Sequence, residues 1–119
     1  MRMNFTTRNK YHNVKTRDEN GVLFDSAKEK QRWDELRILE AAGEITDLKR
    51  QVRFVLFPQQ EVEGQKIRSC VYIADFVYME NGKQVVEDIK GMRKGTAYEV
   101  FKVKKKWMFQ RYGIWVREI

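Results

Sequence analysis

The spacing of apolar residues predicts two helices and four main strands. In residues 51–57, Val52, Phe54 and Leu56 occupy every second position, which is the period of a strand, and Pro58 ends the run. The expected elements, in chain order, are a short apolar strand 22–24, a helix from about 26 to 42, a connector 45–48, strand 51–57, a turn through Gly64, strands 71–79 and 84–89, a helix 96–112 and a closing strand 114–116.

Asn81 and Gly82 separate two runs that are rich in β-branched and aromatic residues. An Asn-Gly pair between such runs is a strong hairpin signal, because both residues tolerate positive φ. We therefore expect residues 71–79 and 84–89 to pair as a hairpin.

Capping motifs set the expected ends of both helices. Ser26 with Glu29 three residues later is a capping box, and Gly43 stands where a helix commonly ends. Thr96 and Glu99 predict a second capping box, at the start of a helix that ends at Gly113.

Glu29 has a second interpretation besides the cap. On a helical wheel, Trp33 and Leu36 lie within about 40° of it, so the glutamate heads the apolar stripe of the helix. Glu40 falls on the same face, and both interpretations of Glu29 therefore stay open here.

The order helix, three strands, helix, strand predicts an α/β fold with a mixed sheet. A chain of 119 residues suits a single domain, residues 1–119, in which residues 1–20 form a basic N-terminal segment.

Charged residues in two neighbouring strands are candidates for chemistry. Asp75 lies in the middle of a strand, where a carboxylate is unfavourable unless it has a partner. Asp88 and Lys90 are two residues apart and share a face of the next strand. The hairpin brings all three side chains to one place, which predicts either a divalent-metal site beside a cation or a buried salt bridge.

The composition limits the class of binding partner and the kind of metal ion that we expect. The net charge of +7 favours a polyanion, with nucleic acid first and an anionic membrane surface second. No apolar run approaches the roughly 20 residues of a membrane span, and no secretory signal is visible, so we expect a cytoplasmic protein. With Cys70 and His12 as the single cysteine and histidine, a metal would be held by carboxylates, which points to Mg²⁺ or Mn²⁺.

These motifs together resemble the PD-(D/E)XK nuclease superfamily. The similarity is closer to short phage and prophage endonucleases that are related in fold to archaeal-type Holliday junction resolvases, and it covers nearly the whole chain. Ala74 stands where the superfamily name has proline. The residues that carry the resemblance are Asn9-Lys10-Tyr11, Phe24-Asp25-Ser26-x-x-Glu29, Tyr72-Ile73-Ala74-Asp75-Phe76 and Val86-Glu87-Asp88-Ile89-Lys90-Gly91.

The resemblance assigns roles to these positions. It implies that Asp75 and Asp88, with the backbone carbonyl of Ile89, hold Mg²⁺ or Mn²⁺. Lys90 would orient or deprotonate the nucleophile or neutralise developing charge, and Glu29 would complete the acidic cluster directly or through a water. Glu87 points to the opposite face of its strand and is left out.

The implied activity is that of a metal-dependent DNA endonuclease, most specifically a resolvase of Holliday junctions or other branched DNA that acts as a homodimer. A less structure-specific phage nuclease and a non-catalytic nucleic-acid-binding protein of the same fold remain alternatives.

Basic residues around the second helix are the predicted DNA contacts, and a solvated face is the alternative for Lys102, Lys105 and Lys106. Lys104 lies within an expected apolar stripe of Val100, Val103 and Trp107, so it either snorkels to the surface or approaches the active site as a second cation. The whole set is Arg93, Lys94, Lys102, Lys104, Lys105 and Lys106. The aromatic group Trp107, Met108, Phe109, Tyr112 and Trp115 is expected to be core or dimer interface, and His12 a polar loop residue.

Overall fold

The computed structural model describes residues 15–18 and 21–119. His12, residues 9–11 and most of the basic segment 1–20 lie outside the described residues. The elements, in chain order, are β1 (Thr16–Arg17), β2 (Leu23–Phe24), α1 (Ala27–Ala41), β3 (Thr46–Phe57), β4 (Gln60–Val62), β5 (Gln65–Ile67), β6 (Cys70–Glu80), β7 (Lys83–Asp88), α2 (Thr96–Tyr112) and β8 (Arg117–Glu118).

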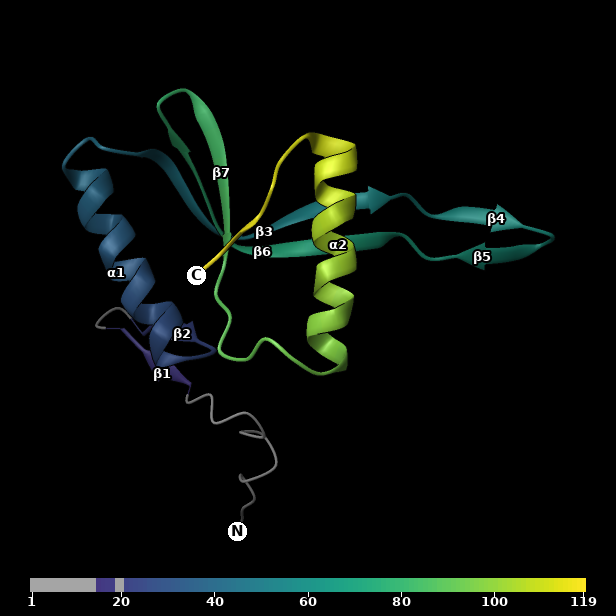
Figure 1. Ribbon diagram of the computed structural model, residues 1–119, viewed down its shortest axis with the longest axis horizontal. Coiled ribbons are helices and arrows are strands. Elements are labelled where there is room, and N and C mark those ends of the chain that lie inside the picture. Colours follow the sequence, from purple (N-terminus) through teal and green to yellow (C-terminus); the bar gives the residue numbers. More distant parts are fainter. Residues whose placement is uncertain (1–14, 19–20) are drawn as a thin grey trace, which may run out of the picture.

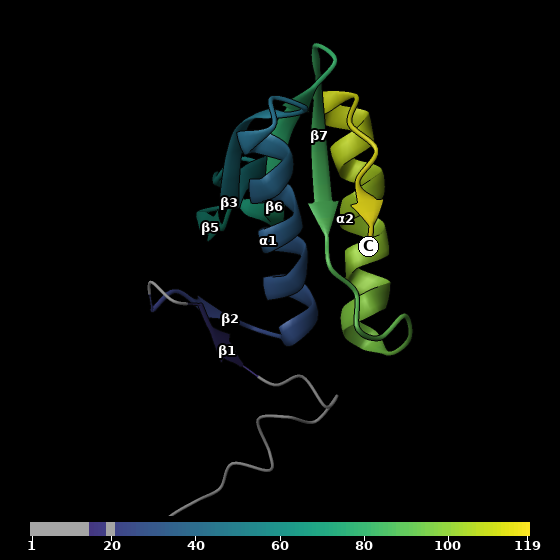
Figure 2. The same cartoon turned by 90° about the vertical axis from the view of Figure 1, so that its left-hand side faces the viewer.

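A four-stranded sheet in the order β3-β6-β7-β8 forms the centre of the molecule. The first two pairings are antiparallel, and β8 lies parallel to β7. Parallel neighbours need a crossover connection, which α2 provides. The two helices lie on opposite sides of this sheet (Figures 1 and 2). The mixed sheet and its helices confirm the predicted α/β fold class.

The predicted hairpin is confirmed as β6–β7. Glu80 pairs with Lys83, and the two residues between them, Asn81 and Gly82, have φ angles of 52° and 77°. Both angles are positive, as a two-residue turn that matches the strand twist requires.

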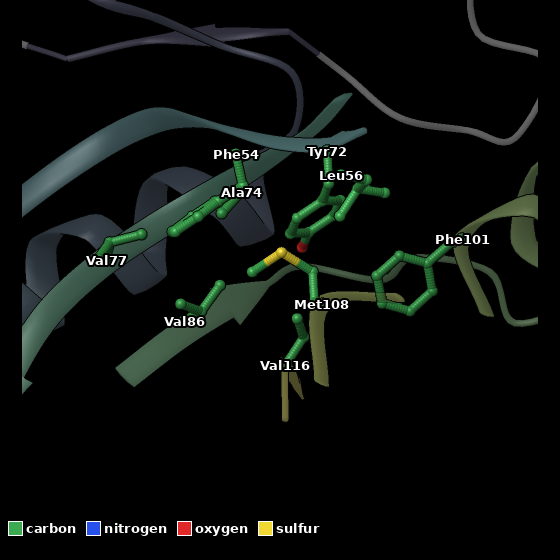
Figure 3. Packing of buried hydrophobic residues seen from close by; sticks show 9 residues of the cluster. All are labelled: Phe54, Leu56, Tyr72, Ala74, Val77, Val86, Phe101, Met108 and Val116. Atoms are coloured by element: carbon green, nitrogen blue, oxygen red, sulfur yellow. The ribbon is translucent and has the colours of Figure 1, made fainter. Parts of the chain in front are cut away.

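Each face of the sheet has its own hydrophobic cluster. Under α1, the buried residues are Leu36, Ile45, Phe76, Tyr78 and Val85. Under α2, they are Phe54, Leu56, Tyr72, Ala74, Val77, Val86, Phe101, Met108 and Val116 (Figure 3). Val85 and Val86 belong to different clusters because successive side chains of a strand point to opposite faces.

The Ser26 half of the first capping box is confirmed, and the second capping box is wrong. Ser26 is the N-cap of α1, and its hydroxyl accepts a hydrogen bond from the Glu29 amide. At α2 the N-cap is Gly95, with φ 94°, and no side chain caps the helix. The chain enters α2 through a backbone conformation that suits glycine, so Thr96 is already the first helical residue.

The outer strands differ from their predicted bounds. β3 begins at Thr46, so the expected connector 45–48 is largely strand. A register shift between Thr46 and Lys49, with positive φ at Asp47, breaks the alternation that would have revealed it. The closing strand is β8, Arg117–Glu118, instead of residues 114–116, because the pairing with β7 begins only at Arg117. Val116, just before it, is buried in the cluster under α2.

The turn through Gly64 is the tip of a further hairpin, β4–β5. This hairpin projects from the end of β3–β6, away from both helices (Figure 1). All six of its strand residues are exposed, so no buried face marked it as strand in the sequence.

The apolar stripe predicted for α2 is not its buried face. Phe101 and Met108 are buried there, whereas Val100, Val103 and Trp107 are exposed. In the aromatic group, Met108 alone is core; the exposed members are Trp107, Phe109, Tyr112 and Trp115. Core is therefore wrong for these four residues, and an interface role remains an expectation.

Candidate active site

Asp75 lies where β6 and β7 separate. The last pair of this ladder is Phe76 with Glu87, and beyond it the Asp75 carboxylate accepts a hydrogen bond of 2.9 Å from the Ile89 amide. From there β7 pairs with β8 through Asp88 and Glu118. The carboxylates of Asp75 and Asp88 thus meet at the fork between the two strands.

The two aspartates interact strongly. Burial raises the pKa of Asp75 well above its ordinary value, and a hydrogen bond to Asp88 and the charge of Asp88 raise it further. Because they come next after the Phe76–Glu87 pair of this antiparallel ladder, Asp75 and Asp88 are cross-strand neighbours, an arrangement that suits a shared cation.

Asp88 is buried and held by two partners. Its Oδ2 accepts a hydrogen bond of 2.8 Å from the Tyr72 hydroxyl and lies 3.3 Å from the Lys90 Nζ. The Lys90 ammonium also lies 3.7 Å from the centre of the Phe101 ring, a cation–π contact. The structure thus brings Asp75, Asp88 and Lys90 together as the sequence predicted.

The backbone of Glu29 takes part in the helix cap, and its side chain takes part in the candidate site. Its backbone amide is capped by Ser26, while its side chain is buried and faces β3. The carboxylate lies 3.5 Å from the Arg50 guanidinium and accepts a hydrogen bond of 3.4 Å from the Gln51 side-chain amide. Burial raises the pKa of Glu29, the nearby Asp25 charge adds to this, and Arg50 opposes it.

Gln51 is a site residue that the sequence did not reveal. Its Nε2 contacts Glu29 Oε2 at 3.4 Å and Asp75 Oδ1 at 3.3 Å, so it bridges the helix glutamate and the strand aspartate. Its backbone has φ 53°, which is uncommon for a non-glycine residue inside a strand. A glutamine at the start of an expected strand carries no signal for either property.

The alternation of side chains changes at this point of the sheet. Tyr72 and Ala74 belong to the cluster under α2, but Phe76, two residues further along β6, belongs to the cluster under α1. Asp75 lies at the change and Gln51 lies opposite it. The irregularity places Asp75 between the two faces, within reach of both Glu29 and Asp88.

The donor set fits Mg²⁺ or Mn²⁺. Two adjacent carboxylates are available from Asp75 and Asp88, and Mg²⁺ is commonly held by one or two carboxylates with waters and substrate phosphates as its other ligands. Within residues 15–18 and 21–119, no three Asp, Glu, His or Cys side chains gather as a metal cage. Because Glu29 is engaged by Arg50 and Gln51, its contribution fits better through a water.

Glu87 belongs to the other face, as its position in the strand predicted. It is fully buried and forms a two-pronged ion pair with Arg32 of α1, at 2.8 and 2.6 Å, and also accepts a hydrogen bond from Tyr78. Burial, followed by that hydrogen bond, raises the pKa of Tyr78 to about 12. This network ties α1 to β7 directly behind Asp88.

The predicted DNA-contacting residues divide into paired and unpaired groups. Arg93 and Lys105 both bind Glu118, at 3.2 and 2.8 Å, and Lys102 binds Glu99 at 3.1 Å. Lys105 has a side chain only 13% exposed, so its position suits a structural ion pair better than a phosphate contact.

The remaining members, Lys94, Lys104 and Lys106, form no ion pair with the described part of the chain. Lys94 and Lys106 are exposed, and Lys104 is half-buried. Lys104 lines the same cavity as Asp88 and Lys90, which supports the second interpretation of this residue, as a cation near the site.

No helix among the described residues has the length and apolar character needed to cross a membrane. No curated protein and no solved structure matches this chain. Residues 8–117 match the family model DUF1064, described as a protein of unknown function, and the chain therefore belongs to the DUF1064 family.

Proposed function

We propose that this protein is a metal-dependent endonuclease that hydrolyses phosphodiester bonds in DNA. The observation that carries the proposal is the pair of cross-strand carboxylates, Asp75 and Asp88, at the fork of β6 and β7, with the Lys90 ammonium 3.3 Å from Asp88. A pair of adjacent carboxylates is unfavourable without a cation, and a protein that only bound DNA would have no use for it.

The residues of the site would have different roles in hydrolysis. Asp75, Asp88 and the Ile89 carbonyl would hold Mg²⁺, which when bound supplies a water of lowered pKa and neutralises charge on the phosphate. Lys90 is fixed by Asp88 and by the Phe101 ring, so its ammonium can donate to a phosphate oxygen or orient the attacking water. The Gln51 amide orients Asp75 from the other side and is itself held by the Glu29 carboxylate.

A net charge of +7 supports a polyanionic substrate. Lys94 forms no ion pair with the described residues and lies in the loop after the catalytic strand, where it lines a cavity with Lys90. A phosphate backbone that approaches Lys90 would pass there. Arg93, Lys102 and Lys105 would have to exchange their carboxylate partners for phosphates to take part.

A resolvase of four-way DNA junctions is the most specific form of this proposal, and it rests on the sequence resemblance. Two copies related by a two-fold axis would cut the two equivalent strands of a junction. An endonuclease with less preference for branched DNA would use the same residues. The relative rates of cleavage of junction and duplex therefore separate a resolvase from a general endonuclease.

The deciding experiment incubates the protein with four-way junction, duplex, flap and single-stranded DNA, in Mg²⁺ and in EDTA. We expect Mg²⁺-dependent cleavage that is fastest on the junction and absent in Asp75→Asn and Asp88→Asn, while both variants keep DNA binding. Cleavage by either variant at the wild-type rate would remove the metal-site assignment. Equal cleavage and binding of junction and duplex would leave a general endonuclease, and failure to cut any DNA would reject the proposal.

A further inference from the structure

A cavity of about 330 Å³ opens between β6 and α2, immediately beside the catalytic pair. Asp88 and Lys90 form one wall, and Tyr72 and Phe101, which hold these two residues, lie in the lining as well. A group that entered this cavity would therefore lie next to the phosphate on which Lys90 acts.

The rest of the wall is mostly apolar. Val71, Ile73 and Val100 contribute to it, and Ile73 and Val100 are 51% and 48% exposed. A groove that contacted only the phosphate backbone would be lined by cations and polar groups. Exposed branched side chains at this position instead suit an apolar part of the substrate, a base or a sugar.

Lys104 adds a charge to the cavity that no described residue neutralises through an ion pair. Its neighbours on α2 are paired, Lys102 with Glu99 and Lys105 with Glu118, but Lys104 forms no ion pair within the described residues. A half-buried ammonium without a partner is unfavourable, because it loses hydration without gaining a counter-charge. An anion that binds in the cavity would supply that charge.

We propose that this cavity binds one unpaired nucleotide next to the scissile phosphate, with its base or sugar against Val71, Ile73 and Val100 and its phosphate on Lys104. This inference rests on the proposed nuclease function and names a feature of the substrate, which at a four-way junction requires a base beside the branch point to unpair. The volume is at the lower end of the range of about 300–1,000 Å³ found for ligand pockets, as expected for a single nucleotide. A base inside a continuous duplex is stacked and paired and cannot enter, whereas an unpaired base can.

Matched variants on α2 test the apolar wall. Val100 lines the cavity and Val103 does not, yet the two valines are similarly exposed, at 48% and 53%. Val100→Gln places a neutral polar group against the base, and Val103→Gln is its control. Glutamine is a better helix former than valine, so both variants should fold, which circular dichroism can verify.

Affinity is measured on a single-stranded oligonucleotide, on a flap and on a continuous duplex of the same sequence, with Ca²⁺ in place of Mg²⁺ to prevent cleavage. Val100→Gln should weaken binding to the single strand and the flap by about tenfold, on the scale of burying one aliphatic side chain, and leave the duplex unchanged. Val103→Gln should change neither. Equal effects of the two variants, or an equal loss on all three DNAs, would overturn the nucleotide subsite.

Lys104→Gln tests the anion contact, with Lys83→Gln as its control on an exposed lysine at the far end of the β6–β7 hairpin. Lys104→Gln should lower the log–log salt slope for single-stranded DNA by about 0.7, the share of one phosphate contact. A salt slope that changes no more than in Lys83→Gln would remove Lys104 from the subsite.

The outcome is separable from the proposed function. If the wild-type protein cuts DNA in Mg²⁺ while Val100→Gln behaves like Val103→Gln, the nuclease proposal stands and the nucleotide subsite is rejected. Wild-type protein that neither binds nor cuts any of these DNAs rejects both.

Discussion

Gln51 lies directly opposite Asp75 in the β3–β6 pair, and its side-chain amide joins that aspartate to Glu29 across 3.3 and 3.4 Å. Its positive φ of 53° coincides with the position at which β6 changes the face to which its side chains point. A backbone conformation of this kind costs on the order of 1 kcal/mol in a non-glycine residue and persists where the surrounding structure imposes it. The strain and the bridge are thus located in one residue of the candidate active site.

Replacement of Gln51 by glycine and by alanine separates these two properties. Both variants lose the amide bridge, so both should need more Mg²⁺ for half-maximal cleavage. Glycine accepts positive φ and alanine does not, so Gln51→Gly should be more stable than Gln51→Ala by about 1 kcal/mol. Thermal unfolding in EDTA measures the stability difference, and Mn²⁺ titration by calorimetry measures metal affinity without catalysis. Equal stability of the two variants would mean that the fold does not impose the positive φ.

The stability of the metal-free protein should fall as the pH rises. Asp75 has an ordinary pKa of 3.8, and burial beside Asp88 raises it in the folded state, so the folded protein binds this proton more tightly than the unfolded chain does. The resulting stabilisation is complete below the ordinary pKa and is lost as the pH rises through the raised value. Unfolding in EDTA between pH 5 and 9, on the scale of about 1.4 kcal/mol per unit of pKa shift, would measure the slope.

Asp75→Asn should flatten that slope, because asparagine cannot titrate but can still accept the hydrogen bond from the Ile89 amide. Metal binding to the wild type should release a proton, which calorimetry in buffers of different ionisation enthalpy detects. A slope that is unchanged in Asp75→Asn would assign the pH dependence to another group.

Glu29→Gln should reduce cleavage strongly and change the melting temperature little. Ser26 caps the backbone amide of residue 29, which the substitution leaves in place, while the carboxylate beside Arg50 and Gln51 is lost. Ser26→Ala is the complementary variant: it should lower stability by about 1 kcal/mol and retain cleavage in the folded protein. Normal cleavage by Glu29→Gln would leave Glu29 with a structural role alone.

Arg32→Leu should destabilise the protein by about 3 kcal/mol, because it leaves the fully buried Glu87 carboxylate without its counter-charge. Glu87→Gln should be milder, since glutamine can still accept the hydrogen bond from Tyr78. Folded Glu87→Gln should keep the Mg²⁺ dependence of cleavage. A loss of metal binding in this variant, measured by calorimetry, would bring Glu87 into the site after all.

Local rules of spacing predicted much of the candidate site. The Asn81–Gly82 turn sets the register of the hairpin, and a period of two residues places Asp88 and Lys90 on one face and Glu87 on the other. The helical period likewise placed Glu29 on the buried stripe with Leu36. These features depend on residues near one another in the chain, so the sequence by itself determined them.

Tertiary structure decided the rest. Helix α2 carries apolar residues on two sides, and only packing against the sheet selects Phe101 and Met108 as the buried ones and leaves Val100 and Val103 exposed. The same packing places Lys104 in the lining of the cavity and pairs Lys105 with Glu118, although the two lysines are adjacent in sequence. The bridge from Gln51 depends on a local change of alternation in β6, which arises where two separately packed clusters meet across one sheet. No regular period encodes that meeting point, because the free energy that sets it comes from contacts between residues far apart in the chain.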